Sequence, residues 1–265
     1  MRVEYWFGSF DKLCLKRKRD MKNTITIACA SLSLAVTTFE TQADFTQPGF
    51  LFRLFEGGLA SGGEACNFGS VTQVAANEWF FQGQHSNTIG TSMSWAYLVD
   101  PDPFITGTLS LTNETAFSKE YVVDFSLPIS PAIAQSTVSG QMSGTLTDSN
   151  GSGSASLTST NGGAIYTALA DDMFVQSLMS NANQIVTSPF GTNSFSGGSF
   201  GQGLPPLAGP SINSTIGIRY SFTLSAGDSV SFSSIFVALP VPAPGVIAMG
   251  ILAGFTARRG RRRSA

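Results

Sequence analysis

The stretch STIGIRYSFTL, residues 214–224, is the clearest strand pattern in the chain. From Thr215 to Leu224, large apolar residues hold every second position, and Thr, Gly, Arg and Ser hold the positions between them. Because successive side chains of a strand point to opposite faces, this period of two predicts a β-strand with one buried face. Such alternation is typical of antiparallel sheets whose other face meets solvent.

The same alternation recurs along the chain and predicts an all-β fold. Turn-forming residues, such as Asn161-Gly-Gly163, separate the alternating segments. Short strands at near-regular spacing, without long helical patterns, predict an antiparallel β-sandwich or a jelly-roll-like fold. Besides 215–224, the expected strands are 73–81, 91–98, 104–112, 120–127, 137–147, 153–159, 164–170 and 229–238.

Two segments of this region depart from the pattern. DDMFVQSLM, residues 171–179, begins with two aspartates and predicts a short helix, with a strand as the alternative. Residues 191–209 are rich in Gly, Ser and Pro and predict a long loop. Residues 44–240 are expected to form one domain, and its roughly 200 residues are enough to bury a core.

Charge is strongly segregated along the chain, although the formal net charge is only −2. Seven of the 15 Lys and Arg residues lie in residues 1–22, and five lie in residues 258–263. Between Asp44 and Asp228, three Lys or Arg stand against 13 Asp or Glu, a net charge of −10. Because such an acidic surface repels phosphate backbones, nucleic acid is not an expected partner.

Residues 21–43, MKNTITIACASLSLAVTTFETQA, have the order of regions found in secretory signal peptides. Lys22 precedes a mostly apolar stretch, 25–36, and a polar stretch then ends at Ala43, the expected cleavage position. The expected signal helix is too short to span a bilayer comfortably. Residues 1–20 are either an extended n-region or a mis-called start that precedes the true start, Met21. A buried N-terminal helix is the alternative interpretation.

Cysteine usage gives no disulfide or redox pattern. Cys14 and Cys29 lie in the N-terminal region, Cys66 stands alone between residues 44 and 240, and no CxxC occurs. Because one cysteine cannot build a disulfide framework, Cys66 is expected to be a small buried hydrophobic residue.

No segment carries a complete set of catalytic residues. The chain has one histidine, His85, and a Gly-x-Ser-x-Gly match at residues 197–201 centred on Ser199. That match lies in a Gly/Ser-rich stretch, lacks a strand–turn–helix context and is followed by no histidine. His85 is therefore expected in a loop or at a strand edge, and the chain is not expected to be an enzyme. A secreted hydrolase is kept as an alternative function, ranked after the two that are given at the end of this section.

A glycosidase is one kind of hydrolase, and its active site needs two carboxylates about 5–9 Å apart. The candidates are Asp100 with Asp102, Asp171 with Asp172, and Glu78. Prolines beside the first pair are typical of a turn. No cofactor is expected.

Asp148 and Asn150 open the segment DSNGSG, residues 148–153, which begins like a Ca²⁺-binding loop. The segment lacks the later oxygen ligands and the closing glutamate of such a loop. A β-turn is therefore the main interpretation, and a calcium site is the weak alternative.

Aromatic residues that face solvent can mark carbohydrate binding. Trp79, Phe80 and Phe81 are consecutive, so at least one of them is expected to face outward in a strand. Trp95 and Tyr97 are the other candidates, and they share a face with Met93. In an all-β domain such residues more often belong to the core, which is the main interpretation here.

The C-terminal tail, residues 241–265, reads VPAPGVIAMGILAGFTARRGRRRSA. Its apolar part, Val246–Ala257, would form about 18 Å of helix, whereas a hydrocarbon core is about 30 Å thick. Prolines before it prevent a regular helical extension upstream. The arginine cluster is expected to stay in the cytoplasm by the positive-inside rule. Its members are Arg258, Arg259, Arg261, Arg262 and Arg263. A plain short membrane anchor is one interpretation of this short apolar helix.

The tail also resembles a PEP-CTERM sorting signal, in which Val-Pro-Glu-Pro precedes an apolar segment and an arginine cluster. Val241, Pro242, Ala243 and Pro244 match that motif with alanine in place of glutamate, and Gly245 completes the Val-Pro-Ala-Pro-Gly variant. The resemblance implies a bacterial export that an exosortase-type transpeptidase recognises and processes, with transient membrane contact. It also implies surface or matrix association, often with exopolysaccharide, and no catalytic residues.

Residues 136–159, 165–171 and 214–239 further resemble the β-rich passengers that are common in such proteins. The sequence thus predicts an exported, non-enzymatic protein of the bacterial cell surface or extracellular matrix, with residues 44–240 as its passenger. A carbohydrate-binding module of the exopolysaccharide matrix is the second alternative.

Overall fold

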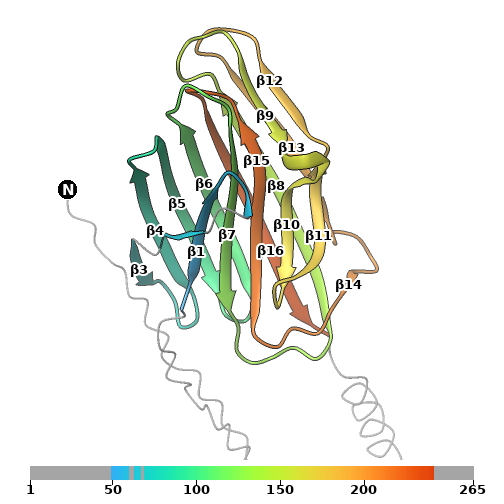
Figure 1. The fold of residues 1–265 in the computed structure, drawn as a ribbon. Coiled ribbons are helices and arrows are strands. Elements are labelled where there is room, and N and C mark those ends of the chain that lie inside the picture. Colours follow the sequence, from blue (N-terminus) through green and yellow to red (C-terminus); the bar gives the residue numbers. More distant parts are fainter. Residues whose placement is uncertain (1–48, 60–62, 67–68, 242–265) are drawn as a thin grey trace, which may run out of the picture. The chain divides into compact units, whose positions relative to one another are not determined.

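The described part of the chain is an antiparallel β-sandwich, which confirms the predicted fold class (Figure 1). The computed structural model describes residues 49–59, 63–66 and 69–241. All of them belong to the unit Asp44–Ala265, which is distinct from the unit Met1–Ala43. The expected signal helix, the cleavage position and the sorting tail after Val241 lie outside the described residues. Within those residues, no helix has the length and apolar character needed to cross a bilayer.

Sheet A has the strand order β11-β10-β15-β7-β1-β2, with β9 paired to β15 and β12 paired to β9. Its strands are β1 (Leu51–Glu56), β2 (Glu64–Ala65), β7 (Lys119–Pro128), β9 (Ala155–Ser159), β10 (Ala164–Ala170), β11 (Met173–Ser180), β12 (Asn183–Val186) and β15 (Thr215–Leu224). A 3₁₀ turn, Thr160–Gly162, joins β9 to β10.

Sheet B has the strand order β13-β8-β16-β6-β5-β4-β3, with β14 paired to β8. Its strands are β3 (Ser70–Gln73), β4 (Trp79–Asn87), β5 (Thr91–Asp100), β6 (Phe104–Asn113), β8 (Ser136–Thr147), β13 (Thr192–Phe200), β14 (Leu207–Gly209) and β16 (Ser229–Pro240). Most of the long strands, such as β5, β6, β7, β15 and β16, are those whose alternation is regular in the sequence, and β13 is an exception.

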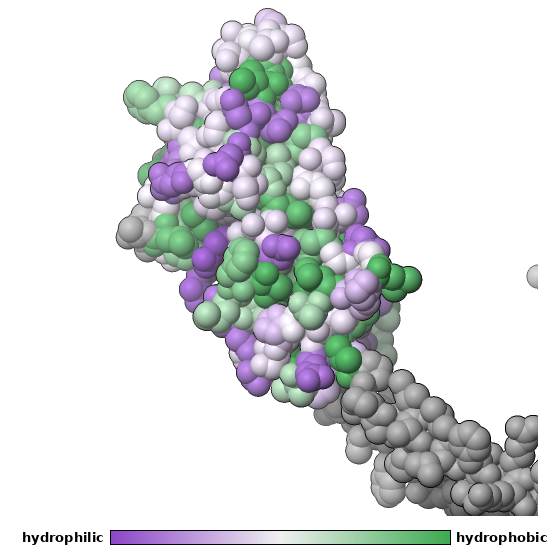
Figure 2. All heavy atoms as spheres, turned by 90° about the vertical axis from the view of Figure 1, so that its right-hand side faces the viewer, coloured by the Kyte–Doolittle hydropathy of each residue, from purple (hydrophilic) through white to green (hydrophobic). Residues whose placement is uncertain are grey.

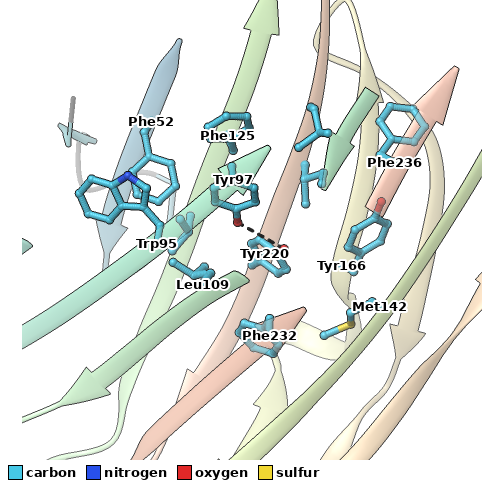
Figure 3. Close-up of a cluster of buried hydrophobic side chains, with 14 of the residues drawn as sticks. Phe52, Trp95, Tyr97, Leu109, Phe125, Met142, Tyr166, Tyr220, Phe232 and Phe236 are labelled. Carbon is cyan, nitrogen blue, oxygen red and sulfur yellow. Dashed lines mark hydrogen bonds between the residues drawn. The ribbon is translucent and has the colours of Figure 1, made fainter. Parts of the chain in front are cut away.

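The core is an aromatic layer between the two sheets (Figure 3). Tyr97 of sheet B stacks on Phe125 of sheet A with ring centroids 4.5 Å apart. Tyr220 of sheet A stacks on Phe232 of sheet B with centroids 5.0 Å apart. Such pairs contribute about 0.5–1.5 kcal/mol beyond the burial of their surface, so they help to hold the sheets together.

The hydroxyl groups of the buried tyrosines in this layer are hydrogen-bonded, whereas Nε1 of Trp95 has no hydrogen-bond partner within the described residues. The Tyr97 hydroxyl donates to the Tyr220 hydroxyl at 3.5 Å, drawn as the dashed line in Figure 3. The Tyr220 hydroxyl in turn bonds the Ser234 hydroxyl, and the Tyr166 hydroxyl donates to the Ile235 carbonyl at 3.1 Å. The interior therefore buries whole tyrosine side chains without leaving these hydroxyl groups unpaired.

The helix predicted for residues 171–179 is wrong, because β11 occupies this segment. Asp171 and Asp172 have φ of 49° and 61° and form the turn of the β10–β11 hairpin. Two central residues with positive φ are the requirement of a type I′ hairpin turn, which Asp tolerates better than most residues. The two aspartates thus mark a turn and not the first turn of a helix.

The long loop predicted for residues 191–209 is wrong over most of its length, because β13 and β14 lie there. In the register of β13 on β8, Phe195 faces Gly144 and Phe200 faces Gly140. A Cβ at either glycine would lie 2.5 Å from the facing ring, so each ring fills the space that a side chain would take. These aromatic–glycine pairs hold a Gly/Ser-rich segment in the sheet.

The strand predicted at 73–81 combines the end of β3 and the start of β4, which a turn at residues 74–78 separates. The sequence pattern also missed β1, β2 and β12. All three are short and lie near sheet edges, where alternation is weak because pairing to a distant strand decides the structure.

Candidate functional site

The structure does not bring Ser199 and His85 together. Ser199 is exposed on β13, and His85 lies on β4, with its Nε2 3.4 Å from Glu64 Oε2. Five strand spacings separate β13 from β4, about 24 Å across sheet B. Ser199 also lies within a regular strand and not on the sharp turn that a nucleophile of this motif needs.

The two aspartate pairs lie in turns of different sheets. Asp100 ends β5, and the Asp102 N–H donates to Asp100 Oδ1 at 2.9 Å, as in a polar turn. Asp171 and Asp172 form the β10–β11 turn of sheet A. Glu78 lies in the β3–β4 turn.

Asp171 fastens the β10–β11 turn to the segment before β15. Its carboxylate accepts hydrogen bonds from the N–H groups of Asn213, Ser214 and Thr215 at 2.7, 2.8 and 3.0 Å. The Ser214 hydroxyl and the Asn213 side-chain amide also donate to it. Burial opposes ionisation, but these hydrogen bonds outweigh it and lower the pKa of Asp171. The carboxylate is therefore a structural acceptor.

Asp148 is fully buried and closes its own turn. Its Oδ1 accepts from the N–H groups of Gly151 and Ser152 at 2.9 and 3.2 Å, and its Oδ2 accepts from the Gly153 N–H at 2.7 Å. Asn150 Oδ1 accepts from the Ser152 N–H at 2.7 Å. These contacts have the geometry of the expected turn, and the calcium site stays a prediction. Within the described residues, no group of three or more His, Cys, Asp or Glu side chains is arranged to hold a metal.

The tryptophans and the cysteine belong to the core, as the sequence predicts. Trp79 and Trp95 are 8% and 3% exposed, so neither ring is free to stack on a ligand. Cys66 is fully buried, and burial raises the pKa of its thiol to about 11. Trp79 and Cys66 are therefore core residues, and Trp95, although it borders a hollow of about 450 Å³, exposes almost none of its side chain.

A hollow of about 240 Å³ lies on the outer face of sheet A, over strands β1, β7, β15 and β10. These strands are neighbours in the sheet and lie side by side in Figure 1. We call it the arginine hollow. Its lining residues are Leu51, Arg53, Asp124, Phe125, Ser126, Leu169, Asp172, Thr215, Gly217 and Arg219.

A row of charged side chains crosses the arginine hollow. Arg53, Asp124 and Arg219 are paired in register on three adjacent strands, so their side chains stand on one face. Arg219 Nε and Nη2 donate to the two oxygens of Asp124 at 2.6 and 2.7 Å. This bidentate hydrogen bond raises the pKa of Arg219, so the guanidinium stays charged.

The next row of the register makes the hollow concave and partly apolar. Gly217 stands between Ser126 and Leu169, and a Cβ there would lie 2.9 Å from the Phe125 carbonyl oxygen. Leu169 is paired in turn with Phe174 of β11, whose side chain is 63% exposed. Paired residues share a face, so Phe174 lies on the same face of the sheet as Leu169, one strand beyond the lining of the hollow.

Figure 2 faces the side on which Figure 1 draws β11, β13 and β14, and it shows apolar side chains gathered among polar ones. The exposed apolar residues of β11, β12 and β14 are Met173, Phe174, Ile185 and Leu207. Met173 and Phe174 are neighbours in the chain, so the start of β11 exposes two large apolar side chains.

On the outer face of sheet B, the central strands β6, β16 and β8 carry many hydroxyl side chains and no charged residue, with Ile235, Val237 and Leu239 as apolar neighbours. These strands place hydroxyl side chains side by side, and the Ser110 hydroxyl donates to the Ser231 hydroxyl at 2.9 Å. The hydroxyl residues of β6, β16 and β8 on this face are Thr106, Thr108, Ser110, Thr112, Ser229, Ser231, Ser233, Thr137, Ser139, Ser143, Thr145 and Thr147.

Sequence reasoning missed the arginine hollow, although part of its signal was present. The alternation of 120–127 and 215–224 already places Asp124 and Arg219 on outward faces. The register that sets them beside each other, and beside Arg53, is a long-range property. Only three Lys or Arg occur between Asp44 and Asp228, and this rarity also singles out Arg53 and Arg219 in the sequence.

Comparison with known proteins adds no family to this description. No protein-family model matches the sequence. A search of curated proteins finds no relative.

Proposed function

We propose that the chain is an exported, non-enzymatic protein of the bacterial cell surface or extracellular matrix. The observation that carries the proposal is the pair of terminal signals, a secretory pattern ending at Ala43 and a sorting-type tail from Val241. Between them lies one β-sandwich, in which the central strands of sheet B carry many hydroxyl side chains and no charged residue on their outer face. In this proposal an exosortase-type transpeptidase processes the tail near Pro242–Gly245, so membrane contact is transient.

Two epitope tags on the full chain test the sorting proposal. One tag follows Ala265, and the other is inserted at the exposed turn Asn161–Gly163. We expect mature surface or released protein to carry the internal tag and to lack the C-terminal tag. In a control with residues 258–263 changed to serine, both tags should stay on cell-bound protein. Mature surface protein that keeps the C-terminal tag contradicts processing.

A carbohydrate-binding module is the second candidate function, and the arginine hollow is the observation that favours it. The hollow combines guanidinium donors and carboxylate acceptors, and an exposed aromatic ring, Phe174, lies on the neighbouring strand β11. Sugars offer adjacent hydroxyl groups and apolar C–H faces, which need this mixture of contacts. Glycan-array binding that is lost on Arg53→Gln supports this function, and an array without any signal counts against it.

A further inference from the structure

The arginine hollow contains hydrogen-bonding capacity that the sandwich itself does not use. Arg53 is exposed, and its guanidinium makes no hydrogen bond or ion pair within residues 49–59, 63–66 and 69–241. Arg219 directs two of its five N–H groups to Asp124, which leaves three donors. A ligand in the hollow would therefore meet two guanidinium groups, one of them entirely available.

The acceptors in the hollow complement these donors. Each Asp124 oxygen accepts one hydrogen bond from Arg219, although a carboxylate oxygen has room for two. Asp172 is exposed at the same hollow and close enough to Arg219 to raise the pKa of that guanidinium. Adjacent hydroxyl groups, which both donate and accept, match such a set better than a ligand with acceptors alone.

One guanidinium group of the hollow is open to an anionic group, although the lining also holds two carboxylates, Asp124 and Asp172. Among the described residues, three Lys or Arg stand against twelve Asp or Glu. Two of the three cations, Arg53 and Arg219, line this one hollow. Lys119 is held by Glu56 at 2.9 Å, and Arg219 by Asp124, so Arg53 is the cation available to an incoming carboxylate.

We propose that the arginine hollow binds a sugar that carries a carboxylate, that is, a uronic acid unit of an acidic polysaccharide. This inference rests on the carbohydrate-binding candidate above and names its ligand class. The sugar carboxylate pairs with the Arg53 fork, and its hydroxyl groups bond Asp124 and the remaining donors of Arg219. The apolar face of the ring lies against Leu169 and Phe174. At about 30 Å³ for each water molecule, the hollow holds about eight waters, which suits one ring and not a folded peptide.

The test is a titration of the full chain, labelled with ¹⁵N, with two matched sugars. D-Galacturonate and D-galactose differ in having a carboxylate or a hydroxymethyl group at C6. We expect galacturonate to shift the amide signals of Gly217 and Leu169 and to bind about tenfold or more tightly than galactose. Arg53→Gln should abolish this difference, Arg53→Lys should restore part of it, and added salt should weaken it.

A second pair of variants tests the apolar wall. Phe174→Ala should weaken galacturonate binding several-fold, whereas Phe190→Ala should leave it unchanged. Phe190 is a suitable control because it is 71% exposed and its ring lies beside Gly151 on another turn. Equal weakening by both variants contradicts a specific contact with Phe174.

The remaining outcomes distinguish the uronic acid inference from the carbohydrate-binding candidate on which it rests. Equal binding of galactose and galacturonate overturns the uronic acid inference and leaves carbohydrate binding in place. Acetate binding as tight as galacturonate binding also overturns it, because the sugar ring then contributes nothing. If neither sugar binds while all variants keep the wild-type melting temperature, the inference and the carbohydrate-binding candidate both fail. The epitope-tag experiment is independent of all these results.

Discussion

At the scale of single residues, buried and half-buried carboxylates in this sandwich hold turns together. Asp171 binds the segment 213–215, and Asp148 binds the N–H groups of its own turn. Both are paired with polar donors that no periodicity reveals. Local turn chemistry was predictable for Asp148 from the Asp-x-Asn-Gly pattern, whereas the partners of Asp171 lie more than forty positions further along the chain.

Asp171→Asn is expected to destabilise the sandwich. The amide replaces an acceptor oxygen by a donor, so at least one N–H group of 213–215 loses its partner. We expect the melting temperature at pH 7 to fall by about 3–6 °C. Because folding lowers the pKa of Asp171, its contribution is present above the unfolded pKa of about 4 and is lost as the pH falls below it.

The effect of Asp171→Asn should therefore shrink between pH 5 and pH 3, as followed by thermal unfolding. Asp172→Asn is the matched control, since Asp172 is the exposed neighbour in the same turn. It should change the melting temperature little at either pH. Equal losses in the two variants would show that the turn conformation matters and the hydrogen bonds do not.

Asp228 presents the opposite case, a buried carboxyl beside another carboxyl. Burial and the nearby charge of Asp148 raise the pKa of Asp228. Its contribution to stability is therefore full below the unfolded pKa of about 4 and declines as the pH rises through the folded pKa. Asp228→Asn should remove this decline and raise the melting temperature at pH 7 by a few degrees. Asp148→Asn, in contrast, should lower it, because three N–H groups bind that carboxylate.

At the scale of elements, the strands with long alternation were predictable and the strands held by a neighbour were not. Residues 215–224 coincide with β15, because every inward position is large and apolar. β13 has no such pattern, and it is a strand because Phe195 and Phe200 cover glycines of β8. The arginine hollow was likewise not predictable from local patterns, because it depends on the register of β1, β7 and β15.

Gly144→Ala tests the aromatic–glycine pairing. The new methyl group would lie 2.5 Å from the Phe195 ring and 2.7 Å from the Ser231 carbonyl oxygen, so the ring must move. We expect a loss of about 1–3 kcal/mol in the free energy of unfolding, measured by urea denaturation. Gly203→Ala is the control, because nothing lies within 4 Å of a Cβ at Gly203. A neutral Gly144→Ala would remove this explanation of β13.

At the scale of the whole described unit, one continuous core joins the two sheets. The buried cluster runs from Phe50 to Ala238 and includes residues of both sheets. The antiparallel sandwich was predictable because strand alternation is local and repeated. The order of strands was not, because it arises from pairings such as β15 with β7 across almost a hundred residues.

A single core predicts a single unfolding transition. Near-ultraviolet circular dichroism reports the aromatic layer, and far-ultraviolet circular dichroism reports the strands. We expect the two signals to change at the same urea concentration. Separate midpoints would mean that one sheet or one end of the sandwich unfolds independently.

The buried thiol of Cys66 can report on local opening of sheet A. Its N–H donates to the Phe52 carbonyl at 2.8 Å, its side chain is fully covered, and its pKa of about 11 keeps it protonated. An alkylating reagent can therefore react only when the structure around β1 and β2 opens and the thiol ionises. The rate at which Cys66 is alkylated thus measures how often the strand that carries Arg53 leaves the sheet.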